Sequence, residues 1–132
     1  MTGPVHLPAV GIGALVALAV AVPTAVLAQA LDEAGTVEDD STWLIVLFVV
    51  VLGGMIAGGY VAATRRADAP LTNSALAALA AYLLVQTIAA IRLVVNDDSV
   101  AWAAIPFFAL LCAAAGMTGG LLADHRARKP RR

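Results

Sequence analysis

The chain has 132 residues, of which 61% are hydrophobic and 13% are charged, and its formal net charge is −1. Its mean hydropathy is +0.91, and it carries about half the charge of an average soluble domain. This composition argues against a water-soluble protein and indicates an integral membrane protein that has no room for a separate soluble catalytic domain.

Four long stretches of the chain contain no Asp, Glu, Lys or Arg, at 1–31, 41–64, 69–91 and 99–123. They predict membrane spans at 9–30, 43–64, 72–95 and 101–123, the third of which also includes Arg92. Each stretch exceeds the roughly 20 apolar residues that a helix needs to cross a bilayer. Because lipid offers no partner to backbone N–H and C=O groups, the spans are expected to be α-helices. The predicted fold class is an all-α membrane protein: residues 1–132 form one four-helix transmembrane domain of two helical hairpins, with a basic cytoplasmic tail at 124–132.

The first span has a second interpretation, as a cleaved signal peptide. Residues 28–30 read AQA, the small-x-small form of a signal peptidase site, and Pro23 lies shortly before them. Residues 1–8 lack the Lys or Arg of a signal peptide, and the apolar stretch 7–31 is longer than usual for one. We therefore expect the span to be retained, whereas cleavage would leave three spans.

Small residues recur every four positions in the second and fourth spans, at Gly54 and Gly58 and at Gly116 and Gly120. Residues four apart share one helix face, and a face without side chains lets two helices approach closely. Packing inside a four-helix bundle is favoured, and a homodimer interface is the alternative.

The second hairpin repeats the pattern of the first. EDDSTW at 38–43 and NDDSVAW at 96–102 are each followed by an apolar run, glycines and basic residues. This order favours a duplicated hairpin, as a parallel repeat. Convergence is the alternative, because bacterial hairpins commonly place acids and Trp outside and Arg inside.

The four spans, the GGMIAGGYVAATRR end of the second span and the basic tail together resemble small four-helix membrane proteins of Gram-positive bacteria with GC-rich genomes. In those proteins a glycine-rich helix is followed by an Arg-containing cytoplasmic loop. The resemblance implies the four-helix fold, and it implies no activity, cofactor or catalytic residue.

Polar residues of the third span are the main candidates for a ligand contact. Arg92 near its outer end is expected to pair with Asp97, Asp98 or the acids of the first loop, and a role in attracting an anion or lining a pore is the alternative. The other candidates are Tyr82, Gln86 and Thr87, which predict an interhelical hydrogen-bond cluster rather than a transport site. Pro23 and Pro106 lie where each is expected to kink its helix.

Charge predicts the orientation of the chain. Seven of the nine acidic residues lie in the first and third connections, whereas Arg65 and Arg66 lie in the second. The positive-inside rule then places both termini in the cytoplasm, with Trp43 and Trp102 at the outer surface. The resemblance implies that the membrane is a bacterial plasma membrane, which the chain is expected to cross several times. The tail is expected to attract anionic lipid or only to fix topology; its basic residues are Arg126, Arg128, Lys129, Arg131 and Arg132.

Candidates for catalysis and metal binding are few. His6 and His125 have no ligand spacing, Cys112 is the single cysteine, and no nucleophile and base are paired. We expect no cofactor, no metal, no nucleic acid partner and no enzyme activity. The sequence favours a non-catalytic subunit or scaffold that packs through small-residue faces as a homo-oligomer or with a larger membrane protein; the alternative is a small oligomeric transporter or channel.

Overall fold

The computed structural model describes residues 5–35 and 42–129. They form four helices, α1 (Leu7–Glu33), α2 (Thr42–Arg65), α3 (Pro70–Val95) and α4 (Ala104–Arg128). This part of the chain contains no β-strand. Each helix is long and apolar enough to cross a membrane. The predicted all-α fold class with four candidate spans is therefore confirmed.

The bounds of α4 differ most from the expected span. It begins at Ala104, after the turn that holds Trp102, and it continues to Arg128. The start of the expected tail is therefore helical, and residues 130–132 lie outside the described part of the chain. Pro106 falls in the first turn of α4, where backbone N–H groups have no helical partner in any case. The kink expected at this proline is wrong for that reason.

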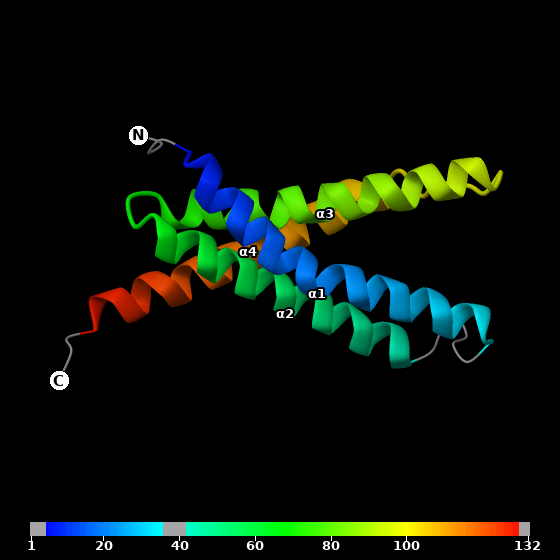
Figure 1. The fold of residues 1–132 in the computed structure, drawn as a ribbon, viewed down its shortest axis with the longest axis horizontal. Coiled ribbons are helices and arrows are strands. Elements are labelled where there is room, and N and C mark those ends of the chain that lie inside the picture. The colour runs from blue at the N-terminus through cyan, green and yellow to red at the C-terminus, as the bar shows by residue number, and fades with distance from the viewer. Residues whose placement is uncertain (1–4, 36–41, 130–132) are drawn as a thin grey trace.

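Pro23 lies inside α1, which remains one helix from Leu7 to Glu33. A proline at this position cannot donate a hydrogen bond to the carbonyl of Ala19, four residues earlier. Figure 1 shows that α1 changes direction along its length, which is the expected result of a missing helical hydrogen bond.

The four helices cross one another near their middles (Figure 1). α1 and α2 run side by side toward one end of the molecule, and α3 and α4 run toward the same end but diverge from the first pair. α2 contacts all three other helices, whereas α1 and α4 do not touch each other. The hairpins are thus joined mainly through α2, and they separate beyond the crossing.

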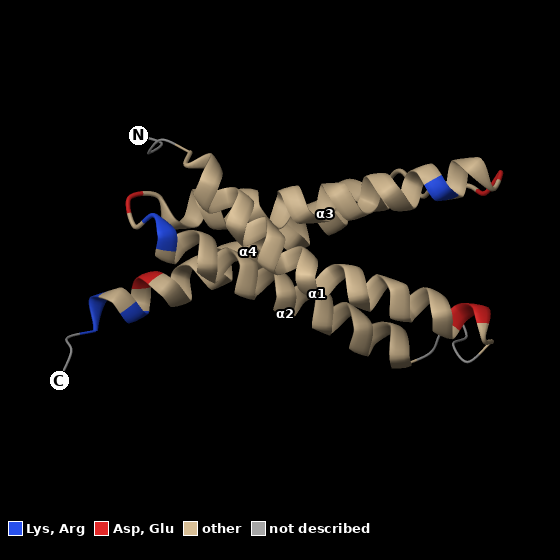
Figure 2. Cartoon of the chain, in the orientation of Figure 1, with Lys and Arg blue, Asp and Glu red and all other residues tan. Residues whose placement is uncertain are grey.

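Charged residues gather at the two ends of the helices and leave the middle without charge (Figure 2). The acidic end is formed by the last residues of α1 and α3 and the first residues of α2 and α4. The basic end is the opposite one, with the loop between α2 and α3 and the last turns of α4. This distribution suits a protein that spans a membrane; which side each end faces stays a prediction.

Glycines form the helix crossings. α1 meets α2 at Gly13 and Gly58, where a Cβ atom added to Gly58 would lie 2.5 Å from the Gly13 carbonyl oxygen. α2 meets α4 at Gly59 and Gly116, where an added Cβ would overlap the Gly116 backbone. Real Cβ atoms are essentially never found so close to another atom. These helix backbones approach as closely as they do because no side chains separate them.

The four glycines singled out in the sequence face other helices of the same chain. A Cβ on Gly54 would lie 2.7 Å from the Cβ of Val20 in α1, and one on Gly120 would lie 2.5 Å from the Ser74 hydroxyl oxygen in α3. The buried cluster beside them consists mostly of alanine: Ala17, Ala21, Met55, Ala78, Ala81 and Cys112. The glycine faces are therefore used for packing inside the bundle.

Candidate functional site

A large cavity lies at the acidic end, between the diverging hairpins. It is a cleft of about 580 Å³ whose walls come from α1, α2 and α3 and from the residues that follow α3. Its charged and polar lining residues are Gln29, Asp32, Glu33, Arg92, Asn96 and Asp98. The cleft exists because the α1–α2 and α3–α4 pairs separate beyond the glycine crossings (Figure 1).

A chain of hydrogen bonds crosses this cleft. The Arg92 guanidinium of α3 donates to the side-chain oxygen of Gln29 in α1. The Gln29 amide in turn donates to a Glu33 carboxylate oxygen at 2.8 Å, one helical turn further along α1. The sequence led us to expect a carboxylate partner for Arg92, yet its partner within the described residues is a neutral amide. The carboxylates of Asp32, Glu33 and Asp98 line the same cleft, but none of them forms an ion pair with Arg92.

A second cavity, a chamber of about 220 Å³, lies deeper between the four helices. Its walls are formed by Ala21, Ala25, Phe48, Val51, Met55, Tyr82, Val85, Gln86, Phe108 and Cys112. Phe48 and Phe108 contact each other edge to face across the chamber wall, with ring centroids 5.6 Å apart. Apart from Tyr82 and Gln86, the lining is apolar.

The cleft and the chamber follow one another along three helices. Ala25 of the chamber precedes Gln29 of the cleft by four residues, and Val85 precedes Ala89 by the same interval. On α2, which runs in the opposite direction, Leu44 of the cleft precedes Phe48 of the chamber by four residues. Four residues are about one helical turn, so the chamber lies one turn below the cleft on each wall.

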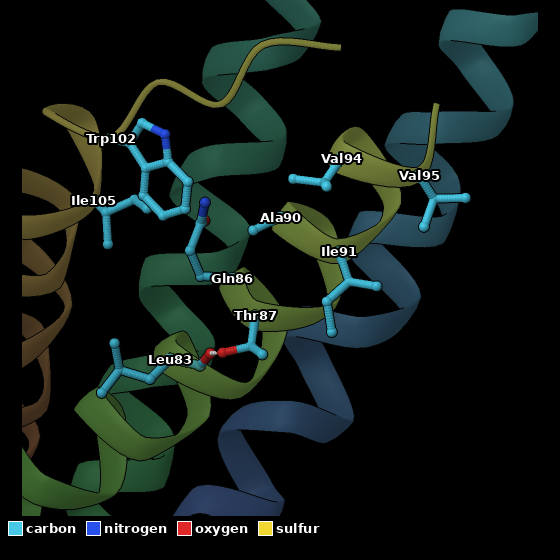
Figure 3. Close-up of a pocket in the computed structure, with 9 residues that line it drawn as sticks. All are labelled: Leu83, Gln86, Thr87, Ala90, Ile91, Val94, Val95, Trp102 and Ile105. Atoms are coloured by element: carbon cyan, nitrogen blue, oxygen red, sulfur yellow. Dashed lines mark hydrogen bonds between the residues drawn. The ribbon is translucent and has the colours of Figure 1, made fainter. Parts of the chain in front are cut away.

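The predicted cluster of Tyr82, Gln86 and Thr87 does not form as expected. The Tyr82 hydroxyl donates to the carbonyl of Ile105 in α4 at 3.1 Å, so it does join two helices. Thr87 is exposed and donates to the Leu83 carbonyl of its own helix at 2.7 Å. Gln86 has no hydrogen-bond partner within the described residues and extends toward the Trp102 ring (Figure 3). Gln86 and Thr87 are neighbours on the helix and point in different directions, so Thr87 lies away from the chamber that Tyr82 and Gln86 both line.

Figure 3 shows the groove on the other side of α3, which Gln86 also lines. The groove has a volume of about 400 Å³, and its walls are apolar apart from Gln86 and Thr87. Trp102 and Ile105 line the side of the groove opposite α3 (Figure 3). Gln86 therefore lies between two cavities, the groove outside the bundle and the chamber within it.

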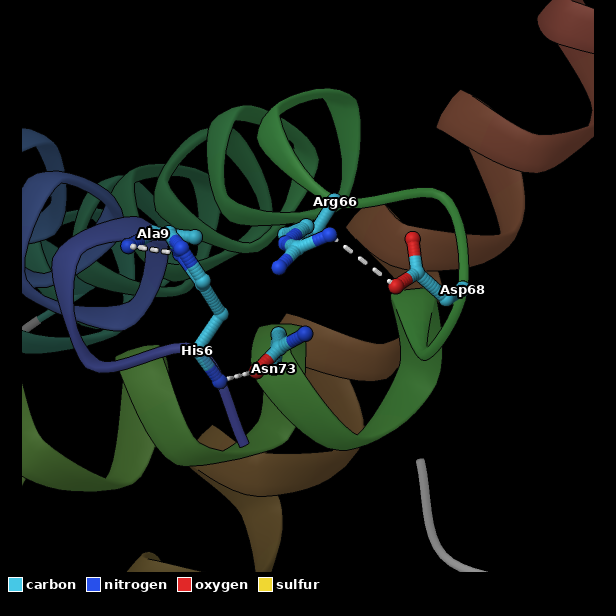
Figure 4. Close-up of polar contacts among 5 residues, drawn as sticks. All are labelled: His6, Ala9, Arg66, Asp68 and Asn73. Carbon is cyan, nitrogen blue, oxygen red and sulfur yellow. Dashed lines mark hydrogen bonds and ion pairs between the residues drawn. The ribbon is translucent and has the colours of Figure 1, made fainter. Parts of the chain in front are cut away.

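The basic end contains two buried polar residues that the sequence analysis did not predict as a site. Asn73 and Ser74 are fully buried in the first turn of α3. The Asn73 side-chain oxygen accepts the backbone N–H of His6 at 3.1 Å (Figure 4). The Ser74 hydroxyl lies 2.8 Å from the Gly59 carbonyl oxygen and 2.5 Å from the Pro70 carbonyl oxygen, and its single proton is donated to one of them at a time. The sequence contains one sign of this site: Asn73 and Ser74 are two polar residues on the helix face that Ala77 and Ala78 continue one turn later.

Hydrogen bonds to Asn73 and His6 fix the start of α1. His6 also caps α1, because its Nδ1 accepts the backbone N–H of Ala9 at 3.3 Å (Figure 4). Nearby, Arg66 forms an ion pair with Asp68 at 3.2 Å. The Asn73 side-chain nitrogen has no hydrogen-bond partner among the described residues.

Two of the basic residues expected to contact lipid already have partners in the protein. The Arg126 guanidinium lies 5.7 Å from the centre of the Tyr60 ring, and Arg128 forms an ion pair with Asp124 at 3.0 Å. Lys129 follows the end of α4. Arg131 and Arg132 lie outside the described residues, and contact of this tail with anionic lipid stays a prediction.

Within residues 5–35 and 42–129, no three His, Cys, Asp or Glu side chains gather in a way that would hold a metal ion. His125 lies in the last turns of α4, far along the chain from the capping His6, and Cys112 is buried beside the chamber.

Comparisons with family models, with curated proteins and with solved structures find no match to this chain. The resemblance to four-helix proteins of Gram-positive bacteria therefore stays a prediction, supported only by the four candidate spans.

Proposed function

We propose that this chain is a non-catalytic subunit or scaffold of the bacterial plasma membrane, with both termini in the cytoplasm. The observation that supports the proposal is that the interior of the bundle consists of small, tightly packed residues with few polar side chains. Glycine and alanine fill the helix crossings, and the buried polar side chains of the described residues are Thr24, Asn73 and Ser74. Such a core gives a rigid support for contacts made on the outside.

The partner is a larger membrane protein or a second copy of the chain. The glycine faces contact helices of the same chain, so such a partner would meet the bulky aliphatic side chains on the outside of the bundle. One exposed stretch is the first half of α2, which presents Leu44, Ile45, Val46, Val49 and Val50. In lipid, helix association depends on van der Waals packing, and this stretch offers a large area for it.

Affinity purification of a tagged chain in native nanodiscs, read by native mass spectrometry, tests this proposal. A larger membrane protein in fixed stoichiometry is the expected result. Substituting Val49→Ala and Val50→Ala together should weaken that complex, whereas Leu110→Ala on the exposed face of α4 serves as a control. A chain purified without any partner and without a second copy would contradict the subunit role.

A small oligomeric transporter or channel is the second candidate, and the cleft with a chamber one helical turn below it favours this function. Gln86 of the chamber and Arg92 of the cleft are two of the polar side chains that a solute would meet. Ion or solute flux in proteoliposomes that is lost in Gln86→Ala and Arg92→Gln, but kept in Arg128→Gln, would support this function over the scaffold. Absence of flux in the unaltered chain would count against it.

A further inference from the structure

We infer that the cleft and the chamber together form a binding site for one zwitterionic phospholipid that carries a primary ammonium group, with its headgroup in the cleft and an acyl chain in the chamber. The inference goes beyond the scaffold role and does not depend on a protein partner. It rests on the mixed charge of the cleft, the apolar lining of the chamber, and the depth of the two together.

The charges of the cleft suit a headgroup that carries both signs. Arg92 supplies one positive charge, and Asp32, Glu33 and Asp98 supply three carboxylates around it. Arginine is well suited to phosphate because its planar guanidinium donates several hydrogen bonds in a fixed geometry. The guanidinium uses one nitrogen for Gln29, and its remaining donors are enough for a phosphate.

The carboxylates define the second half of the ligand. An ammonium group two carbons from the phosphate would be attracted to Asp32, Glu33 or Asp98. A headgroup without an amine would leave these carboxylates without a positive partner. An anionic lipid would meet these carboxylates with a like charge, and a free metal cation would meet the charge of Arg92. The mixed lining therefore favours phosphatidylethanolamine over phosphatidylglycerol and over an ion alone.

The chamber accounts for the acyl chain. Its walls are the apolar side chains of Phe48, Val51, Met55 and Phe108, together with Ala25 of α1. An aqueous ion would have to be desolvated there with almost no polar groups to replace its water. An acyl chain gains favourable contacts in such a lining.

The depth of the site matches one leaflet of a bilayer. From Arg92 at the cleft to Tyr82 at the chamber, α3 covers ten residues, or about 15 Å at the rise of an α-helix. Half of the roughly 30 Å hydrocarbon core of a bilayer is the same length. A phospholipid with its phosphate beside Arg92 would therefore place its chain at the level of the chamber.

Native mass spectrometry of the full-length chain, titrated separately with dioleoyl phosphatidylethanolamine and dioleoyl phosphatidylglycerol in one detergent, tests the site. We expect the ethanolamine lipid to bind about tenfold more tightly, which corresponds to one charge-assisted hydrogen bond. Glycerophosphoethanolamine, which has the headgroup without the chains, should bind at least tenfold more weakly than the lipid.

Two pairs of variants locate the lipid. Arg92→Gln should weaken phosphatidylethanolamine binding about tenfold, whereas Arg128→Gln, the same change at the basic end, should leave it unchanged. Ala25→Phe should fill the chamber and prevent binding, whereas Val26→Phe, on the adjacent exposed position of α1, should not. If Ala25→Phe fails to fold by circular dichroism, Ala89→Phe on the cleft wall replaces it.

Equal affinity for the two lipids would overturn the inference, because it would show that the carboxylates do not recognise an amine. Undiminished binding in a folded Arg92→Gln or chamber-filling variant would also overturn it, by placing the lipid elsewhere on the apolar surface. Equally tight binding of glycerophosphoethanolamine would show a headgroup site without a chain site. None of these results bears on a protein partner, so failure of the lipid site is distinguishable from failure of the scaffold role.

Discussion

The glycine crossings and the acidic end are built from the same helices but from side chains of different size. Along α2 the bulky residues Phe48 and Val51 come first, and Gly54, Gly58 and Gly59 follow. α4 repeats this order, with Phe107 and Phe108 before its glycines. Where side chains are absent, helices meet backbone to backbone; where they are large, helices separate and leave cavities. A gradient of residue size along α2 and α4 therefore accounts for the separation of the hairpins at the acidic end.

Placing a side chain in a glycine crossing is the strongest way to disturb this arrangement. Gly59→Val should lower the free energy of unfolding by about 3 kcal/mol, because its Cβ would overlap the Gly116 backbone and force two helices apart. Gly53→Val in the same helix is the control, since a Cβ there meets nothing within 4 Å. SDS titration of the detergent-solubilised protein measures both, and equal effects would refute the role of the crossing.

At the basic end, Asn73→Ala should cost about 1.5 kcal/mol, because it leaves the part-buried backbone N–H of His6 without its acceptor. Thr72→Ala, the neighbouring change at a less buried position, should have little effect. The same titration compares the two. Equal stability of Asn73→Ala and the unaltered chain would mean that this hydrogen bond does not hold α1 against α3.

At the acidic side of the crossing, Tyr82→Phe should cost only about 0.6 kcal/mol, a usual value for one interhelical hydrogen bond in a membrane protein. Tyr60→Phe is the matched control, because the Tyr60 hydroxyl has no hydrogen bond within the described residues and its ring contact with Arg126 is retained. If Tyr82→Phe lost more unfolding free energy than Asn73→Ala, the acidic side of the crossing would be held together more strongly than the basic end, the reverse of what we expect.

The smallest effect is expected at the surface. Arg128→Ala removes an exposed ion pair with Asp124 and should change the free energy of unfolding by less than about 0.5 kcal/mol. Thermal unfolding at low and high salt gives the check, and a marked salt-dependent loss would show that the end of α4 contributes more than its exposure suggests.

Much of the fold follows from the sequence alone. Stretches without charge predict the four helices, because charged side chains are costly in lipid and therefore lie at helix ends. The spacing of Gly54 and Gly58 predicts close contact, although the partner helix does not follow from that spacing. The structure supplies it: these two glycines meet α1, and Gly59 meets α4.

The site was predicted less completely. Arg92 stands out as the single charge of the third span, but its contact with Gln29 depends on how α1 and α3 diverge, which no local pattern encodes. Asn73 was missed, and Ser74 was expected only as one of the small residues of the third span, because polar residues near a helix start usually face water. Their burial follows from the close approach of α1, α2 and α4 at the basic side of the crossing.

Distance measurements between pairs of spin labels in nanodiscs test the central claim, that α1 and α3 lie close together at the basic end and separate at the acidic end. In a Cys112→Ala background, one pair joins α1 to α3 at the acidic end, at Ala30 and Val95, and the other joins the same segments at the basic end, at Val5 and Leu71. The account predicts a longer distance for the acidic pair. An acidic pair no farther apart than the basic pair would contradict it.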